Sequence, residues 1–271
     1  MNEEQTRIHS GGRDILIRFC AGLEEMGACA ALQVDIWGYE DGDALPRRSF
    51  QLSAKIGGQV IGAFDVTGES PDASGNTSNL IGFAMALPGI KEHAQPYLHS
   101  HMLAVRQEYR NLSIGRQLKL AQRRDALQRG IHLMEWTFDP LEIKNAFLNI
   151  ARLGAVVRSY TANFYGVSSS RLQGGLPTDR LHAEWWMNSE RVQSALRGEL
   201  VAPGDIQETI IVPGAISEWK SSPQGREPAL RLQSENRERF QSAFARGLAV
   251  LGFRKDTNGN GIYSLGPWQE P

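Results

Sequence analysis

The sequence predicts an α+β domain in which one mixed β-sheet is covered by helices on both faces. Segments with strand-like and helix-like spacing of apolar residues follow one another between residues 14 and 187. Hydrophobic residues make up 41% and charged residues 22% of the 271 residues, which is typical of a soluble globular protein. No segment repeats at a fixed period. One sheet between two helical layers would bury all of these apolar stripes.

The first half of the chain provides the helices and strands that lead to a central turn. We expect helices over residues 14–32 and 47–55, strands over 59–66, 80–87 and 97–105, and a helix over 114–128. Pro46 suits the first turn of the second helix, and Gly57 would end it. Ser113 is the expected N-cap of the third helix, with Gly130 just beyond its end. The basic residues of that helix, Lys119, Arg123, Arg124 and Arg129, are expected on a solvated face.

The second half continues the same alternation and then changes character. We expect a strand over residues 131–138, a helix over 141–153, and strands over 156–165 and 181–187. Beyond these come a strand within 204–214, a loop over 217–228, a helix over 230–251 and a strand within 259–267. The predicted domains are therefore residues 1–188 and an extension, 189–271, of strand, helix and strand. The extension is short for an independent core and should pack on the main sheet.

Charge and composition exclude several classes of partner. The formal net charge is −1, so no overall field favours nucleic acid or an anionic membrane. No apolar run approaches the ~20 residues of a membrane span, and the acidic N-terminal residues are unlike a signal peptide. We expect a cytoplasmic protein in which Cys20 and Cys29 are reduced thiols, although a disulfide between them stays open. No pattern fixes the oligomeric state, so a homodimer also stays open.

The stretch from Leu103 to Arg124 carries the strongest functional signal. A short apolar strand enters a turn, and a long amphipathic helix follows; the turn is Arg110, Asn111, Leu112, Ser113, Ile114 and Gly115. Such a junction points unpaired backbone N–H groups and the positive end of a helix dipole at one place. A phosphate or diphosphate fits that place, and Arg110 and Arg116 would add positive charge near it. A plain helix cap without a ligand is the alternative.

This turn resembles the motif of the GNAT superfamily of acyl-CoA-dependent N-acyltransferases. The family has Gln or Arg, two residues, Gly, one residue, and Gly or Ala between its fourth strand and third helix. Arg110 and Gly115 match that register, and Ser113 replaces the first glycine. The segments YLHSHMLAV, WTFDPL, NAFLNIARLGA, YTANFYG and PTDRL together resemble a bacterial GNAT-like subfamily. The resemblance covers residues 14–187 and implies a mostly antiparallel sheet that binds acetyl-CoA or another acyl-CoA, without a metal.

The resemblance also implies where the reaction takes place. The pantetheine arm would lie in a V-shaped opening between the strand of His101 and the strand of Trp136. Strand alternation predicts that His99, His101, Leu103 and Val105 share one face, with Leu103 and Val105 beside the cofactor. His99 aligns with a catalytic glutamate of several members, so His99 or His101 is the candidate base, ahead of Glu135. Alternatively, one histidine only satisfies buried hydrogen bonds. The pair resembles a metal clip too weakly to predict a metal site.

The proton donor of the family is missing from its usual position. Many members carry a tyrosine four residues before the glycine that ends the fourth helix, and that position is Ile150 here. Tyr160 and Tyr165 are candidate replacements, and Tyr165 is preferred. A strand tyrosine is also a common core residue, and a thiolate can leave without an acid. Asn145 and Asn149 either contact the cofactor arm, as in the family, or are surface amides.

The remaining candidates concern the acceptor. Arg180, beside Asp179 in PTDRL, would bind a carboxylate of the acceptor or the acyl group, unless the two residues form local salt bridges. The main hypothesis is transfer of an acetyl or succinyl group to a small-molecule amine, such as an amino acid, by direct attack on the thioester. A catalytically silent CoA-binding module is the alternative. Thioester hydrolysis or transfer to oxygen is a third possibility.

Overall fold

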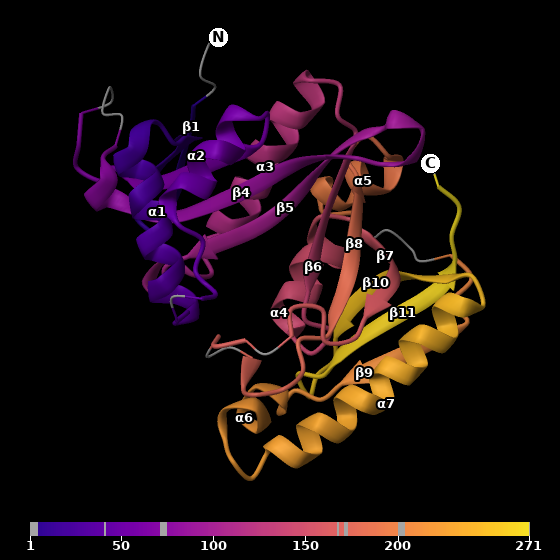
Figure 1. The fold of residues 1–271 in the computed structure, drawn as a ribbon. Coiled ribbons are helices and arrows are strands. Elements are labelled where there is room, and N and C mark those ends of the chain that lie inside the picture. The colour runs from indigo at the N-terminus through magenta and orange to yellow at the C-terminus, as the bar shows by residue number, and fades with distance from the viewer. Residues whose placement is uncertain are drawn as a thin grey trace. The chain divides into compact units, whose positions relative to one another are not determined.

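The computed structural model describes residues 5–40, 42–70, 75–166, 168–170, 173–199 and 204–270 (Figure 1). The chain divides into two compact units, Met1–His132 and Leu133–Pro271. The boundary expected at residue 188 therefore lies inside the second unit, so residues 189–271 group with the strands that precede them. None of the described helices is both long enough and apolar enough to cross a membrane.

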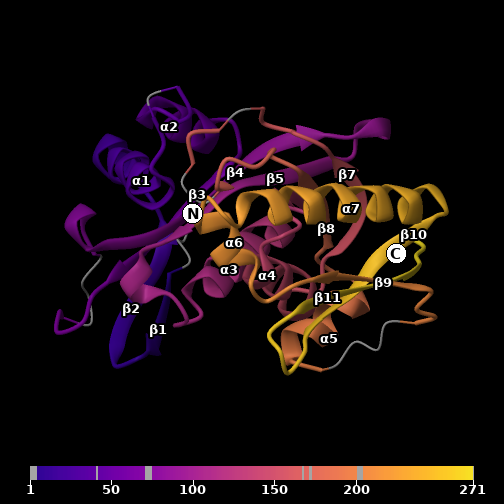
Figure 2. The same ribbon diagram turned by 90° about the horizontal axis from the view of Figure 1, so that it is seen from below.

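The first unit is an antiparallel sheet between two helical layers. Its elements are β1 (Thr6–Ser10), β2 (Arg13–Phe19), α1 (Gly22–Trp37), α2 (Arg47–Lys55), β3 (Gln59–Asp65), β4 (Leu80–Ile90), β5 (Pro96–Val105) and α3 (Ile114–Gln128). The five strands pair in chain order, each antiparallel to the next. Helices α1 and α2 cover one face and α3 covers the other (Figure 2). Buried side chains on both faces, such as Phe50 and Leu118, hold the layers together.

The helix expected over residues 14–32 is wrong. Residues Arg13–Phe19 form β2, and the helix begins only at Gly22. Ile15 and Ile17 pack toward α3 while Leu16 packs toward α1 and α2, which is the two-residue period of a strand buried on both faces. Pairing with β1 and β3 satisfies the backbone of this strand on both edges. By contrast, the helices expected over residues 47–55 and 114–128 are confirmed.

Cys20 and Cys29 are two buried thiols in contact. Their sulfur atoms lie 3.8 Å apart, well beyond the roughly 2.05 Å of a disulfide bond. The hydrogen bond with Cys29, followed by burial, raises the pKa of the Cys20 thiol. Both side chains pack in the core between the sheet and α1, where they behave as small apolar residues.

The second unit contains six described strands and its own helices. Its elements are β6 (Leu133–Phe138), α4 (Ile143–Ala146), the π-helical segment η4 (Phe147–Arg152), β7 (Val156–Thr161), β8 (Arg180–Trp186), α5 (Glu190–Arg197), β9 (Glu208–Val212), α6 (Ile216–Ser221), α7 (Arg226–Ala245), β10 (Leu248–Lys255) and β11 (Gly261–Pro267). The strands pair antiparallel in the order β6-β8-β7-β10-β11-β9. The mixed α+β class with a mostly antiparallel sheet is confirmed.

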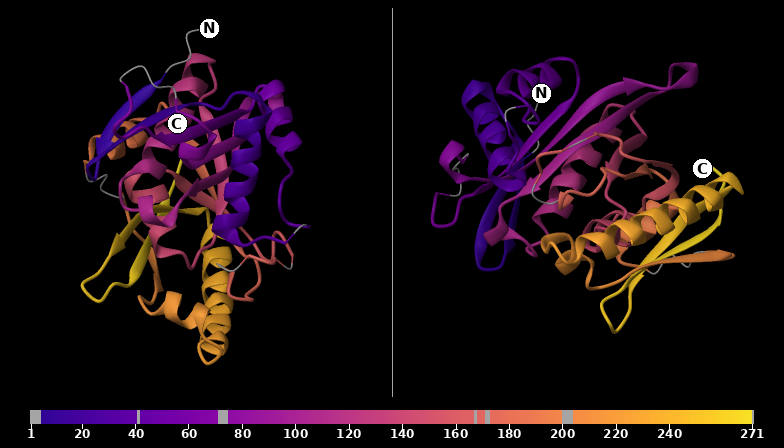
Figure 3. Two further views of the ribbon diagram at one scale, coloured as in Figure 1. Left: turned by 90° about the vertical axis from the view of Figure 1, so that its left-hand side faces the viewer. Right: turned by 60° about the horizontal axis from the view of Figure 1, so that its bottom comes forward.

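The extension differs in detail from the expected strand, helix and strand. The long helix α7 ends at Ala245, and the chain then turns at Gly247 with a φ of 80° to form β10, of which residues 248–251 were predicted as helix. Residues predicted as loop include α6. Val250 of β10 pairs with Val157 of β7. Helix α7 packs against β7, β9 and β10 (Figure 3), and its Phe240 is buried. The extension thus shares the core of the second unit.

Candidate functional site

The turn between β5 and α3, residues 110–115, has the backbone arrangement that an anion site needs, and we call it the phosphate turn. The amides of Asn111, Leu112, Ser113, Ile114 and Gly115 donate no hydrogen bond within the described part of the chain. Asn111 and Ser113 have φ values of 66° and 60°. Left-handed residues of this kind bend the chain so that successive N–H groups converge. Together with the dipole of α3, these amides offer a binding site for a phosphate group.

Ser113 does not act as the expected side-chain cap. Its hydroxyl makes no capping hydrogen bond, and its backbone is left-handed, with φ 60° and ψ 9°. A non-glycine residue in such a sparsely populated conformation costs on the order of 1 kcal/mol. Serine thus adopts the backbone conformation for which glycine is suited. Position 113 contributes the direction of its backbone N–H group. Its side chain is exposed.

The first turn of α3 lies close against β5. A Cβ at Gly115 would lie 3.7 Å from Leu103 Cδ2 and 3.9 Å from Val105 Cγ2, which is ordinary contact. Leu103 and Val105 pack with Ile114 in the α3 core cluster, so they fix the helix relative to the strand. The Nε atom of the exposed Arg110 donates to the Val105 carbonyl at 3.3 Å. Direct contact of these residues, or of the half-buried Arg116, with a cofactor stays a prediction.

A β-bulge in β5 changes the faces predicted for the two histidines. Met85 of β4 pairs with Met102, but the next residue, Ala86, pairs with Ser100, so His101 is the extra residue. The insertion reverses the alternation. Ser100 before the bulge and Leu103 after it both face α3. The prediction that His99 shares a face with Leu103 and Val105 is therefore wrong.

The two histidines nevertheless lie together. Their ring centroids are 6.0 Å apart. Burial lowers the pKa of His101, which keeps its imidazole neutral and able to accept a proton at neutral pH. In the described chain, no three His, Cys, Asp or Glu side chains gather as a metal site would require.

Lys119 was expected on a solvated face and is buried instead. Its Nζ donates to Ser100 Oγ at 2.7 Å, and Ser100 Oγ donates to Gln122 Oε1 at 3.0 Å. Burial lowers the pKa of Lys119 well below its usual value. The signal was available in part, because Lys119, Gln122 and Ala126 form a second buried stripe on α3 at helical spacing. Behind the bulge, β5 and α3 are therefore joined by a polar network.

In the second unit, Tyr165 and Arg180 lie together in what we call the acceptor cluster, made of Thr137, Phe164, Tyr165, Arg180 and His182. The Arg180 guanidinium lies 5.2 Å from the centre of the Tyr165 ring, and Tyr165 Oη is 3.1 Å from Thr137 Oγ1. Phe164 packs edge-on against Tyr165 and His182. Phe164 is 44% and Tyr165 45% exposed, so two aromatic rings face solvent.

Arg180 keeps its charge unneutralised by any carboxylate of the described chain. Its two hydrogen bonds go to neutral oxygens, the Asp179 carbonyl at 2.8 Å and Gln173 Oε1 at 3.3 Å. A half-buried guanidinium held only by neutral groups has unused capacity for a carboxylate ligand.

Asp179, in contrast, is a structural residue. Its fully buried carboxylate accepts from Arg237 Nε at 2.9 Å, from Tyr160 Oη at 2.5 Å and from the Asn163 amide at 2.9 Å. Asp179 therefore forms a salt bridge, but with the distant Arg237 of α7 and not with a local neighbour as the alternative for PTDRL had it. Burial and the Asp179 hydrogen bond raise the pKa of Tyr160, so Tyr160 is a poor proton donor. Sequence reasoning missed Arg237, which lies 58 residues from Asp179.

The two helix asparagines differ in environment. Asn145 in α4 is exposed, whereas Asn149 in η4 is buried. Ile150, at the family tyrosine position, is a core residue. Glu135 in β6 is half-buried. A cofactor contact by either asparagine stays a prediction.

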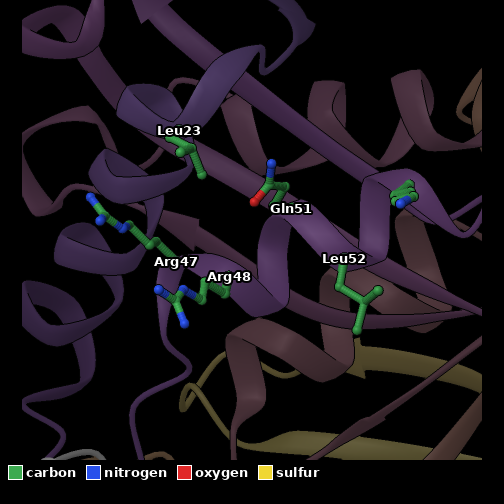
Figure 4. Close-up of a pocket in the computed structure, with 6 residues that line it drawn as sticks. Leu23, Arg47, Arg48, Gln51 and Leu52 are labelled. Atoms are coloured by element: carbon green, nitrogen blue, oxygen red, sulfur yellow. The ribbon is translucent and has the colours of Figure 1, made fainter.

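A second feature of the first unit was not predicted. A hollow of about 450 Å³ on α1 and α2 is lined by Leu23, Arg47, Arg48, Gln51, Leu52 and Lys55 (Figure 4). None of its three cationic side chains pairs with an acidic group of the described chain. The exposed Leu23 and Leu52 make the hollow both basic and apolar. The helix sequence RRSFQLSAK, which contains no acid, carried this signal.

Comparison with known proteins settles the fold. No family model and no curated protein matches the sequence. Among solved structures, Arabidopsis thaliana NAA60 in complex with acetyl-CoA is 16% identical, with a TM-score of 0.51, covering 65% of this chain and 99% of that one. The putative acetyltransferase YncA of Salmonella typhimurium, with acetyl-CoA, is 14% identical, with a TM-score of 0.50, covering 65% of this chain and 95% of that one.

This chain has the GNAT fold. The GNAT resemblance seen in the sequence is thereby confirmed at the level of fold. In GNAT terms, β5 is the fourth strand of the motif, and β1 is an additional strand at the sheet edge. The part of this chain beyond the alignments has no counterpart in these two structures.

Proposed function

We propose that the protein is an acyl-CoA-dependent N-acyltransferase that transfers a short acyl group to a small-molecule amine. The observation that carries the proposal is the phosphate turn on a GNAT fold, where five consecutive amides at the N-terminus of α3 donate no hydrogen bond within the described chain. Coenzyme A has a diphosphate of the right chemistry for such a turn. The amides of residues 111–115 would bind it, with Arg110 adding charge.

The residues of this chain supply the groups that aminolysis of a thioester needs. A neutral His99 or His101 accepts the proton of the acceptor ammonium group. The freed amine nitrogen attacks the thioester carbonyl carbon, the carbon–nitrogen bond forms, and the carbon–sulfur bond breaks. The leaving thiolate takes a proton from the exposed Tyr165 or from water, and the attacking nitrogen loses its second proton to the tyrosinate or hydroxide that results. The expected product is an amide together with free coenzyme A.

Arg180 supports an acceptor that carries a carboxylate, such as an amino acid. Replacing it in Arg180→Ala should raise the KM for carboxylate-bearing amines about tenfold, because one charge-assisted hydrogen bond is lost. The KM for an uncharged amine should not change. Arg231→Ala is the matched control, since Arg231 is exposed on α7 and forms an ion pair with Glu227. An equal loss for both kinds of amine would contradict this role.

The proposal is tested by thiol release from acetyl-CoA and succinyl-CoA, with and without a panel of amines that includes amino acids. We expect release only when donor and acceptor are both present, with an N-acyl product in the mass spectrum. Release without an amine would identify a hydrolase instead. Binding of coenzyme A without release from any pair would identify a silent CoA-binding module.

A further inference from the structure

The tip of the N-terminal β1–β2 hairpin lies directly against the phosphate turn. Ser10 Oγ donates a hydrogen bond of 3.1 Å to the Leu112 carbonyl. Gly11, with a φ of 59°, lies so close that a Cβ there would be 2.5 Å from Leu112 Cδ2. A side chain at position 11 would make the end of the Leu112 side chain shift, and the left-handed backbone favours glycine there.

The same hairpin holds the residue that precedes the turn. Tyr109 Oη donates to Asp65 Oδ2 of β3 at 2.7 Å. Arg13, the first residue of β2, donates to Asp65 Oδ2 at 2.7 Å and to Tyr109 Oη at 3.0 Å. Its guanidinium also lies over the Tyr109 ring, 4.6 Å from the centre. The chain is thus attached on both sides of Arg110 and Asn111.

The bond from Ser10 has a consequence for the anion site. In a planar trans peptide the C=O and the N–H point in opposite directions. The peptide between Leu112 and Ser113 therefore directs the Ser113 N–H away from Ser10 when its carbonyl is bound to Ser10. Without that bond, the left-handed Ser113 would gain by rotating this peptide to a more populated conformation.

We propose that Ser10 is a positioning residue for cofactor binding, which keeps the Ser113 amide directed at the diphosphate. This role rests on the proposed function. Ser10 needs no contact with the cofactor, because it acts through the Leu112–Ser113 peptide. The hairpin that extends the GNAT sheet by one strand thereby becomes part of the coenzyme A site.

The test compares Ser10→Ala with Ser10→Thr, which keeps the hydroxyl, and with His9→Ala. His9 is in the same hairpin, but its side chain contacts Asp14 and not the turn. Coenzyme A is titrated into each full-length protein by calorimetry. We expect Ser10→Ala to weaken binding about five- to tenfold, the size of one hydrogen bond, while the other two variants bind like the wild type. In turnover, KM for acetyl-CoA should rise and kcat should stay.

A second readout needs no ligand. The backbone amide chemical shifts of residues 111–115 should change in Ser10→Ala and not in His9→Ala, at equal melting temperature. Equal affinity for coenzyme A in Ser10→Ala and the wild type would overturn the positioning role alone. A wild-type protein with no affinity for coenzyme A would overturn the proposed function and this role with it. Loss of affinity together with a lower melting temperature, not restored in Ser10→Thr, would show a purely structural role and overturn the proposal.

Discussion

The phosphate turn and the acceptor cluster are built in opposite ways. The turn in the first unit uses main-chain amides, and the side chain at its left-handed position 113 makes no hydrogen bond. The acceptor cluster in the second unit uses side chains, with Arg180 and two exposed rings as its chemical groups. A main-chain site depends on backbone conformation, so serine can replace glycine there. A side-chain site depends on residue identity, so its specificity can change with one substitution.

The interactions that hold the two sites in place also differ. The turn is held by hydrogen bonds that link Leu112 and Tyr109 to the side chains of Ser10, Arg13 and Asp65. The acceptor cluster instead adjoins an ion pair between the buried Asp179, next to Arg180, and the half-buried Arg237 of α7. The residue next to Arg180 is thus held by a helix that lies 58 residues further along the chain.

The largest expected effect is on catalysis. It does not involve the residues that hold the phosphate turn or the acceptor cluster in place. The double variant His99→Ala, His101→Ala should lower kcat by roughly 10²–10⁴-fold, because the general base is lost. Coenzyme A affinity should persist, because both side chains lie outside the turn. Stopped assays with saturating acetyl-CoA measure kcat, and calorimetry measures the affinity. A double variant with full turnover would remove both residues from the mechanism.

The dependence of kcat/KM on pH tests the histidine base in a second way. Burial lowers the pKa of His101, and a base acts when neutral. If His101 is the base, kcat/KM should rise with pH through a value below the ordinary ~6.5 of histidine and be flat above it. An inflection at the same pH in His101→Ala would assign it to another group.

The next largest effect concerns the ion pair between Asp179 and Arg237, beside the acceptor cluster. Asp179→Asn should lower the free energy of unfolding by about 3 kcal/mol, because it removes the charge that pairs with Arg237 and leaves a poorer acceptor for Tyr160. Urea denaturation measures the change, with Arg231→Ala as a surface control. Affinity for coenzyme A in the folded variant should be unchanged. An unfolding midpoint equal to that of the wild type would show that this ion pair does not support the unit.

The smallest effect is at the turn itself. Ser113→Gly should raise stability by up to about 1 kcal/mol, because glycine adopts a left-handed backbone without strain. Ser113→Ala should be close to neutral, since the serine hydroxyl makes no capping bond and both residues bear the same strain. Thermal unfolding of the two variants distinguishes them. Destabilisation by glycine would mean that the serine side chain has a role of its own.

The sequence predicts the parts of this protein that depend on short segments. The strand, turn and helix around Ser113 were predicted because turn residues and amphipathic spacing lie next to one another. Residues 14–32 were mistaken for helix because Ile15, Leu16 and Phe19 fit a helical stripe as well as a buried strand. The length of α7 was overestimated because Leu248 continues its apolar spacing past Gly247.

Long-range features were beyond sequence reasoning for physical reasons. The bulge at His101 appears only in the register of β4 against β5, and it decides which face each histidine occupies. The partners Ser10 and Leu112 are 102 residues apart, and Asp179 and Arg237 are 58 apart. Such pairs depend on the completed fold. Their residue types alone do not distinguish them from solvated polar groups.

The central claim is that the amides of the phosphate turn bind the diphosphate of coenzyme A, and titration of coenzyme A into Gly115→Asp and Gly115→Asn tests it most directly. A Cβ at position 115 makes only ordinary contacts, so both variants should fold. We predict that Gly115→Asn binds like the wild type and that Gly115→Asp binds about 100-fold more weakly, because its carboxylate repels the diphosphate. Equal affinities of the two variants for coenzyme A, or a wild-type protein that does not bind it, would contradict the claim.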